Sequence, residues 1–269
     1  MRTARRATHQ GDVRIRVLGS VEVERANSLI PLAGQRQRAL LAALTMDHGK
    51  VVPVDYLIDV LWDQDPPPSA RAKIQSHVSA LRRALGYGSR AGEGALVTKP
   101  SGYVLLAADI QLDLAEFGWL TARGREASAH RRWAEASALF GEALSLWRGP
   151  AYADVMSRAV RSAAAALEEN RLLAAESKAE ADLALGHYEV IVAELSGQLV
   201  RHPLRERLRV QLMRALYQLG SRADALALYR AGRRAMIDEL GLEPSQELRE
   251  LHQSILAGHP APMRKLPDT

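Results

Sequence analysis

The sequence of 269 residues contains no cysteine and only two phenylalanines, and its aromatic residues make up 5% of the chain. Without cysteine, disulfide frameworks, thiolate nucleophiles and cysteine-ligated zinc sites are excluded. No apolar run approaches the roughly 18 residues of a membrane span, and no apolar signal-peptide segment follows the basic N-terminal residues. We therefore expect a cytoplasmic protein with no membrane partner.

Motifs of common catalytic sites are also missing. The chain has no P-loop, no G-x-S-x-G elbow and no H-E-x-x-H pair, and its eight histidines lack the spacing of metal ligands. The adjacent carboxylates Glu168 and Glu169 fall on a long predicted helix and are typical of a solvated face. We expect no enzymatic activity, no cofactor and no metal.

Acidic residues are absent between Asp65 and Glu93. Within this stretch, four apolar residues at spacings of four, three and four predict a helix over 69–85 with one face in a core; they are Ile74, Val78, Leu81 and Leu85. The helix carries four basic side chains and no acidic one. Its opposite face presents Ala72, Lys73, Ser76, Ser79 and Arg83, flanked by Arg71, Gln75 and Arg82.

Such a face suits duplex DNA, because arginine, lysine, glutamine and serine read base edges in the major groove and an acid-free surface attracts phosphates. His77 lies beside the core face and is interpreted as a packing or phosphate-contacting residue. The alternative is an ordinary solvated helix, although such helices usually mix in acidic residues.

The net charge of +5 is concentrated in the first part of the chain. Residues 1–110 hold 15 basic and 10 acidic residues, whereas residues 111–269 hold 21 of each. This division predicts an N-terminal nucleic-acid module and a neutral C-terminal partner module.

The order of elements supports a winged helix. Residues 13–24 alternate as a hairpin does, 29–32 suggest a short strand, and helices are predicted from Gln35 and from Pro53. After the basic helix, capped by Ser69, two short apolar runs flank the turn at 99–102 and predict a hairpin wing. We expect the wing to offer Thr98, Lys99, Ser101 and the Gly102 amide to phosphates.

The residues beyond Asp109 are predicted to be helical almost throughout. A weak repeat recurs at Gly186, Tyr188, Ile191 and Leu195 and again at Gly220, Arg222, Ala225 and Tyr229, which is 34 residues later. A looser match comprises Trp133, Ala136, Phe140 and Ala143. A 34-residue period is that of tetratricopeptide helix pairs, and a plain helical bundle is the alternative.

Several segments resemble one family. GQRQRALLAAL at 34–44, VDYLIDVLW at 54–62 and SHVSALRRALG at 76–86 resemble the OmpR-type winged helix of the Streptomyces antibiotic regulatory protein family. ALSLWRGPAYADV at 143–155 and the segment 223–256, which contains ELGLEPS, are similar to the bacterial transcriptional activator domain that follows it in that family.

The resemblance implies a mainly α protein in which an OmpR-type winged helix-turn-helix precedes an all-α tetratricopeptide-like domain. We expect a flexible N-terminus at 1–12, the winged helix at 13–108, the activator domain at 112–258 and a flexible tail at 259–269. The absence of a P-loop implies the small type of family member, without an ATPase region.

The resemblance further implies an activator of antibiotic biosynthetic genes, located in the cytoplasm at the nucleoid. Its partners would be direct repeats of double-stranded DNA near promoters, bound as a homodimer, and RNA polymerase with its sigma factor. The recognition-helix positions are Arg71, Lys73, Gln75, Ser76, Ser79, Arg82 and Arg83, and the wing positions are Lys99 and Ser101 to Tyr103.

Three alternatives remain open at this point. The chain could be a helical-repeat scaffold whose basic module docks an acidic protein, and a DNA mobility shift separates this reading from the first. A response-regulator output is weakened because no receiver domain precedes residue 13. The helical part could also sense a small molecule, since repeat domains have concave surfaces.

Overall fold

A computed structural model describes residues 13–63, 65–86, 94–106 and 110–259. The predicted flexible termini, apart from His259, lie outside these residues, as does most of the glycine-rich link after the basic helix. The chain forms two compact units, the first made of Met1–Thr121 with Glu142–Arg171 and the second of Ala122–Gly141 with Leu172–Thr269. Each unit is described separately below.

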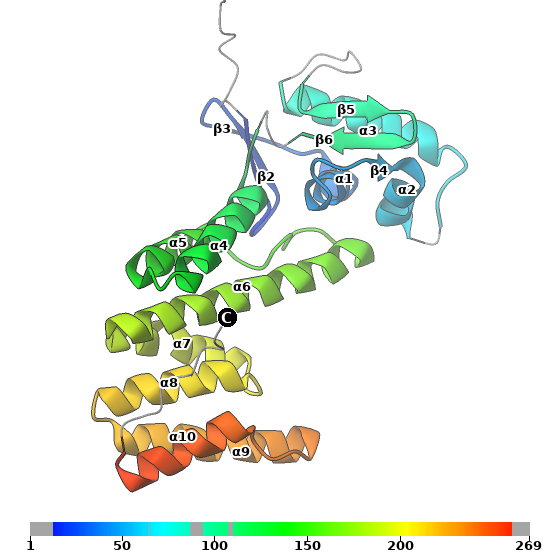
Figure 1. The fold of residues 1–269 in the computed structure, drawn as a ribbon. Helices are drawn as coiled ribbons and strands as arrows, with labels where there is room; N and C mark the ends of the chain where they lie inside the picture. The colour runs from blue at the N-terminus through cyan, green and yellow to red at the C-terminus, as the bar shows by residue number, and fades with distance from the viewer. Residues whose placement is uncertain (1–12, 64, 87–93, 107–109, 260–269) are drawn as a thin grey trace, which may run out of the picture. The chain divides into compact units, whose positions relative to one another are not determined.

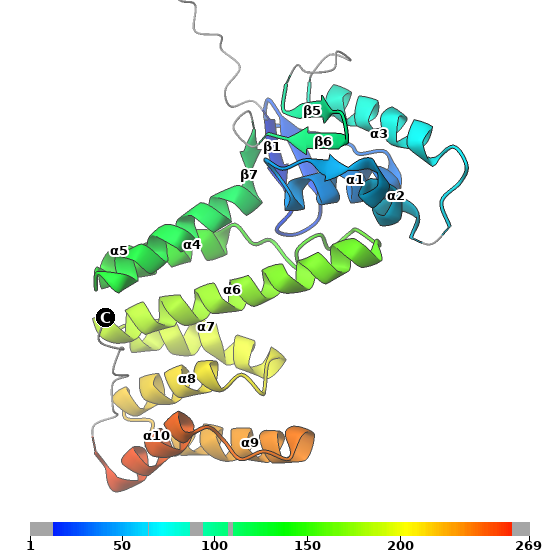
Figure 2. The ribbon, with the colours of Figure 1, turned by 45° about the vertical axis from the view of Figure 1, so that its right-hand side comes forward.

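The first unit begins with a small sheet in the order β3-β2-β1-β7 (Figures 1 and 2). β1 (Val13–Arg16) and β2 (Glu22–Arg25) form the predicted antiparallel hairpin, and β3 (Ser28–Ile30) extends it. β7 (Gln111–Leu112) pairs with β1 in parallel. Alternation at period two buries Val13, Ile15 and Val23 on one face of this sheet.

Three helices and a second sheet complete the winged helix. The helices are α1 (Gly34–Met46), α2 (Val54–Trp62) and α3 (Ala70–Ala84), and the sheet order is β4-β6-β5, with β4 (Val52–Pro53), β5 (Leu96–Lys99) and β6 (Gly102–Leu105). The predicted order of strands, three helices and hairpin is therefore confirmed. The two-residue strands β4 and β7 are additions that no periodicity could indicate.

The segment after α5 (Trp133–Ser145) belongs to the first unit. We call residues 146–157, between α5 and α6 (Arg158–Leu185), the docking loop. Its main chain bonds to the β1–β2 turn: the Arg148 amide donates to the Leu18 carbonyl at 2.8 Å, and the Tyr152 amide donates to the Val17 carbonyl at 2.9 Å. The main chain of the RGPAYADV motif thus pairs with the β1–β2 turn and satisfies backbone carbonyls that are buried there.

Two side chains of the docking loop fix it further. The Asp154 carboxylate accepts the Val21 amide at 2.8 Å and pairs with Arg38 of α1 at 3.0 Å. The Tyr152 hydroxyl meets the Thr45 hydroxyl at 3.1 Å in a buried hydrogen bond. Burial raises the pKa of Tyr152, so the phenol stays protonated and able to donate.

Asp113, the first residue of α4 (Asp113–Ala129), closes the same turn. Its carboxylate accepts the amides of Val17 at 2.8 Å and Leu18 at 3.0 Å. The carboxyl is almost fully buried, and this burial raises its pKa although the backbone donors act in the opposite direction.

The second unit consists of helices. The α6 residues from Leu172 onward are followed by α7 (Tyr188–Arg201), α8 (Glu206–Gln218), α9 (Arg222–Leu240) and α10 (Gln246–Ala257). α7 packs against α8, and α8 packs against both α9 and α10, which contact each other (Figure 1). One core cluster joins α6, α7 and α8, and a second joins α8, α9 and α10.

The predicted repeat marks real helix starts. Gly186 and Gly220 have φ angles of +78° and +80°, a conformation that glycine adopts without strain, and α7 and α9 begin two residues after each. Ile191 and Ala225 are buried at the equivalent places in those helices. This agrees with the tetratricopeptide-like organisation expected from the sequence.

Candidate nucleic-acid interface

Helix α3 presents one apolar face to the core and one polar face to solvent. The four residues predicted for its core face are all buried, and Ile74, Leu81 and Leu85 are at most 1% exposed. Ser69 is the N-cap residue as predicted, but its side chain makes no capping hydrogen bond. The helix is therefore oriented by its apolar stripe.

The outward face carries five of the predicted DNA contacts. These exposed residues are Lys73, Gln75, Ser76, Ser79 and Arg83. Ser76 donates its hydroxyl proton to the Ala72 carbonyl at 3.1 Å, which leaves its oxygen able to accept. No acidic residue lies on α3, so the face combines cationic and neutral donors.

Arg71 differs from these five because it has a protein partner. Its guanidinium lies 2.5 Å from a carboxylate oxygen of Asp55 on α2. Both side chains are more than two thirds exposed, so the pair is screened by water and contributes little to stability. A phosphate can compete for this arginine.

The structure corrects the role predicted for Arg82. Its side chain is 5% exposed, and the guanidinium donates to the Leu96 carbonyl at 3.0 Å and to the Thr98 hydroxyl at 2.7 Å. This burial and these two partners disfavour the predicted phosphate contact. Arg82 instead holds α3 against strand β5 and so sets the position of the wing.

His77 is half-buried on the flank of α3. Burial lowers its pKa, and the positive charges of Arg36 and Lys73 lower it further. The imidazole is therefore neutral near pH 7, which suits packing or a single hydrogen bond better than a charged phosphate contact.

Arg36 of α1 is a basic residue that the sequence reasoning missed. It is exposed, its charge acts on His77, and its guanidinium carbon lies 5.5 Å from the centre of the Trp62 ring. The cation–π contact positions the guanidinium beside α3. Nothing in the local sequence distinguishes Arg36 from Arg38, which pairs with Asp154.

The wing residues divide into exposed and buried ones. Thr98, Lys99 and Ser101 are exposed around the β5–β6 turn, whereas Gly102 and Tyr103 are buried. These two therefore support the wing, and their predicted direct contacts are not favoured.

Gly102 is required by the neighbouring strand. A Cβ atom there would lie 1.9 Å from the Val52 carbonyl oxygen of β4, far inside van der Waals contact. Burial raises the pKa of Tyr103, against the charge of Arg82, which keeps its hydroxyl protonated.

The described parts of the chain hold no group of three histidine, aspartate or glutamate side chains able to bind a metal. Among the same residues, no helix is both long and apolar enough to cross a membrane. The exposed basic and polar residues of α3 and the wing form the candidate nucleic-acid interface of the first unit.

Comparison with known proteins supports this assignment. Residues 31–105 match the family "Transcriptional regulatory protein, C terminal", and residues 112–256 match the "Bacterial transcriptional activator domain". The first match covers the helices and wing described above, and the second begins at β7.

The relatives reported below are named as regulatory proteins and not as enzymes. The chain is 34% identical to the regulatory protein DnrI of Streptomyces peucetius over 95% of this chain and 96% of that protein. It is 38% identical to AfsR of Streptomyces griseus over 91% of this chain but only 24% of that protein.

EmbR of Mycobacterium tuberculosis is 37% identical over 93% of this chain and 64% of its own length. A solved structure of EmbR in complex with a low-affinity phosphopeptide superposes with a TM-score of 0.85 at 35% identity, covering 93% of this chain and 66% of that one. The chain thus spans about a quarter of AfsR and just under two thirds of EmbR.

These matches cover both parts of the chain, in the order that the structure shows. The chain belongs to the Streptomyces antibiotic regulatory protein family of transcriptional regulators, which join an OmpR-type winged helix to a bacterial transcriptional activator domain.

Proposed function

We propose that the chain is a sequence-specific DNA-binding activator of antibiotic biosynthetic genes that acts in the cytoplasm at the nucleoid. In this proposal α3 lies in the major groove and the β5–β6 wing lies along the backbone. The observation that carries it is the exposed, acid-free face of α3, positioned by a fully buried apolar face.

The exposed residues of α1, α3 and the wing fall into two groups, proposed phosphate contacts and proposed base contacts. Arg83 and Lys99, with Arg36, would contact phosphates, because single cationic donors supply salt-dependent affinity without reading sequence. Lys73, Gln75, Ser76 and Ser79 would face base edges. The burial of Arg82, Gly102 and Tyr103 supports a role for them in holding the wing.

We further propose that the protein binds direct repeats as a homodimer and recruits RNA polymerase together with its sigma factor. This part rests on membership of the family. Deoxyribonuclease footprinting on the protein's own upstream promoter would give the repeat spacing, and transcription with purified polymerase would measure activation. Binding without any gain in transcript would refute the activator role.

DNA binding is tested first by fluorescence anisotropy with the same promoter fragment. Gln75→Ala should cost about 1–3 kcal/mol on the native site, with the loss confined to one base-pair position in a series of mutated sites. Gln253→Ala, which removes an exposed glutamine from α10, serves as the matched control and should leave base preference unchanged.

Two outcomes would contradict the proposal. A uniform loss over all mutated sites would remove Gln75 from base reading. Failure of the wild-type chain to shift any upstream fragment would favour the alternative in which the basic module docks an acidic protein.

A further inference from the structure

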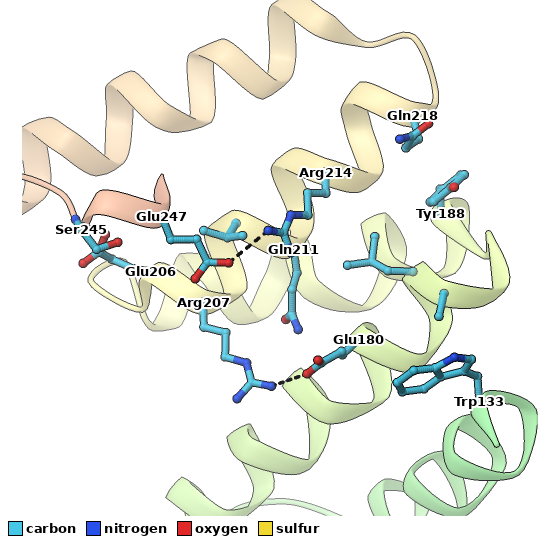
Figure 3. A pocket seen from close by; sticks show the side chains of 13 residues that line it. Trp133, Glu180, Tyr188, Glu206, Arg207, Gln211, Arg214, Gln218, Ser245 and Glu247 are labelled. Carbon is cyan, nitrogen blue, oxygen red and sulfur yellow. Dashed lines mark hydrogen bonds and ion pairs between the residues drawn. The ribbon is translucent and has the colours of Figure 1, made fainter. Parts of the chain in front are cut away.

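The second unit contains a cavity of about 380 Å³ (Figure 3). It is lined by side chains from α5, α6, α7 and α8 and from the start of α10. Cavities that hold small organic ligands begin at roughly 300 Å³, so this one accommodates a small molecule. The cavity belongs to the second unit, whereas α3 and the wing belong to the first.

One side of the cavity is aromatic. Trp133 and Tyr188 lie on the same side in Figure 3, and Leu183 and Ala184 add apolar surface to the lining. Both rings are partly exposed. Aromatic rings of this kind stack on flat apolar groups and attract cations to their faces.

The two arginines of the lining are already occupied by carboxylates. Arg207 pairs with Glu180 at 2.6 Å, and Arg214 pairs with Glu247 at 3.1 Å. An anionic ligand would have to displace a carboxylate from one of them. The cavity therefore disfavours carboxylate or phosphate ligands.

Glu206 is the acidic residue of the lining without an ion pair among the described residues. Its carboxylate accepts the Ser245 amide at 2.7 Å, and in Figure 3 the two residues lie on the side opposite Trp133. The charge of Glu206 acts through space on the pKa of Arg209, but the Arg209 guanidinium donates to the carbonyls of Pro203 and Leu228. Three carboxylates and two guanidiniums leave the lining with one excess negative charge.

Gln211 adds an unsatisfied acceptor to the lining. The residue is 3% exposed, its Nε2 donates to the Glu176 carbonyl at 2.7 Å, and its Oε1 is buried without a hydrogen-bond partner in the described structure. A buried acceptor left unpaired costs about 1–3 kcal/mol. Because this oxygen is closed to solvent, a ligand N–H reaches it only if the Gln211 amide turns toward the cavity, and such a bond relieves that cost.

We propose that this cavity binds a small organic amine. Its apolar, ring-bearing body would lie against Trp133 and Tyr188, and its protonated nitrogen would be directed to Glu206, with the Gln211 carbonyl as a further acceptor. The aromatic side, the excess negative charge and the unpaired acceptor all favour a ligand that donates hydrogen bonds and carries positive charge.

The test uses the full-length chain without DNA and three indoles that differ in charge: tryptamine, neutral tryptophol and anionic indole-3-propionate. Isothermal titration calorimetry should show tryptamine binding at least about tenfold more tightly than indole-3-propionate, with tryptophol between them. Because DNA is absent, the result is independent of the proposed DNA-binding function.

Two variants locate the binding. Ala184→Trp fills the cavity from an exposed helix position and should weaken tryptamine binding at least about tenfold. Ala138→Trp, at an exposed position of α5 outside the lining, is the matched control and should bind as the wild type does. Far-ultraviolet circular dichroism checks that both variants fold.

Glu206→Gln tests the charge while keeping an acceptor for the Ser245 amide. It should narrow the difference in affinity between tryptamine and indole-3-propionate. No saturable tryptamine binding up to about 1 mM, equal affinity for the carboxylate, or unchanged binding by Ala184→Trp would each overturn the proposal.

Discussion

Arg82 and Arg83 are adjacent in sequence, yet the structure gives them opposite roles. Arg82 is buried between α3 and β5, and Arg83 is exposed on the proposed DNA face. Replacing each one separately therefore tests the arrangement of the whole interface.

Arg82→Met keeps much of the aliphatic stem and removes the donors to Leu96 and Thr98. Each hydrogen bond from a charged donor contributes about 1.5–3 kcal/mol, and methionine recovers part of the loss because no charge is buried. We expect the free energy of unfolding of the first unit to fall by about 2–3 kcal/mol. For a unit of this size the melting temperature should drop by about 4–12 °C.

The assay combines thermal unfolding with DNA binding measured at several salt concentrations below the melting transition. Arg83→Ala should leave the melting temperature unchanged and reduce the slope of log K against log salt by about 0.9, the value for one phosphate contact. Arg82→Met should weaken binding without changing that slope. If Arg82→Met reduced the slope without changing the melting temperature, the proposal that Arg82 holds α3 against β5 would be refuted, and the predicted phosphate contact would be supported instead.

Three other expectations follow from the contacts described above. Gly102→Ala should destabilise the first unit by more than about 2 kcal/mol in urea unfolding, because the added Cβ would collide with the Val52 carbonyl. Gly118→Ala on α4 is the control, since a Cβ there meets open space and should not destabilise the unit. Equal effects of the two variants would show that the collision at Gly102 does not occur. Asp154→Ala should lower the free energy of unfolding by about 1–3 kcal/mol because it removes the partner of Arg38 and of the Val21 amide. Asp224→Ala on α9 is the control, and an Asp154→Ala variant as stable as the wild type would mean that this carboxylate does not hold the docking loop. Burial acts to raise the pKa of Asp182, but hydrogen bonds from Ser137 and Lys178 hold it below the usual value. The stability that this carboxylate contributes is therefore present above about pH 3.9 and lost as pH falls below it. Asp182→Asn should make the free energy of unfolding depend less on pH in this acid range, and an unchanged pH dependence would exclude Asp182 as its origin.

Local patterns were sufficient to predict most of the winged helix. The spacing of Ile74, Val78 and Leu81 defines which side of α3 is buried, so the exposure of Lys73 and Ser79 could be predicted as well. The position of the wing could also be predicted, because the conformational preferences of the turn residues at 99–102 are local.

Contacts between distant residues could not be predicted in this way. Arg82 lies next to the apolar stripe, and whether it faces solvent depends on Leu96, which is fourteen residues away. Arg36 comes close to α3 only when α1 and α3 pack together. The cavity likewise gathers Trp133, Tyr188 and Gln211 from three helices, and no spacing in the sequence relates them.

The docking loop bears on how such proteins can be divided. A fragment ending at residue 106 would retain every candidate DNA contact but would lack β7, Asp113 and the loop that satisfy the β1–β2 turn. The main-chain groups of Val17, Leu18 and Val21 would then be exposed beside apolar side chains that are now buried. Chimeras that exchange winged helices between relatives should therefore carry residues 110–121 and 142–171 with them, because the unit that folds is discontinuous in sequence.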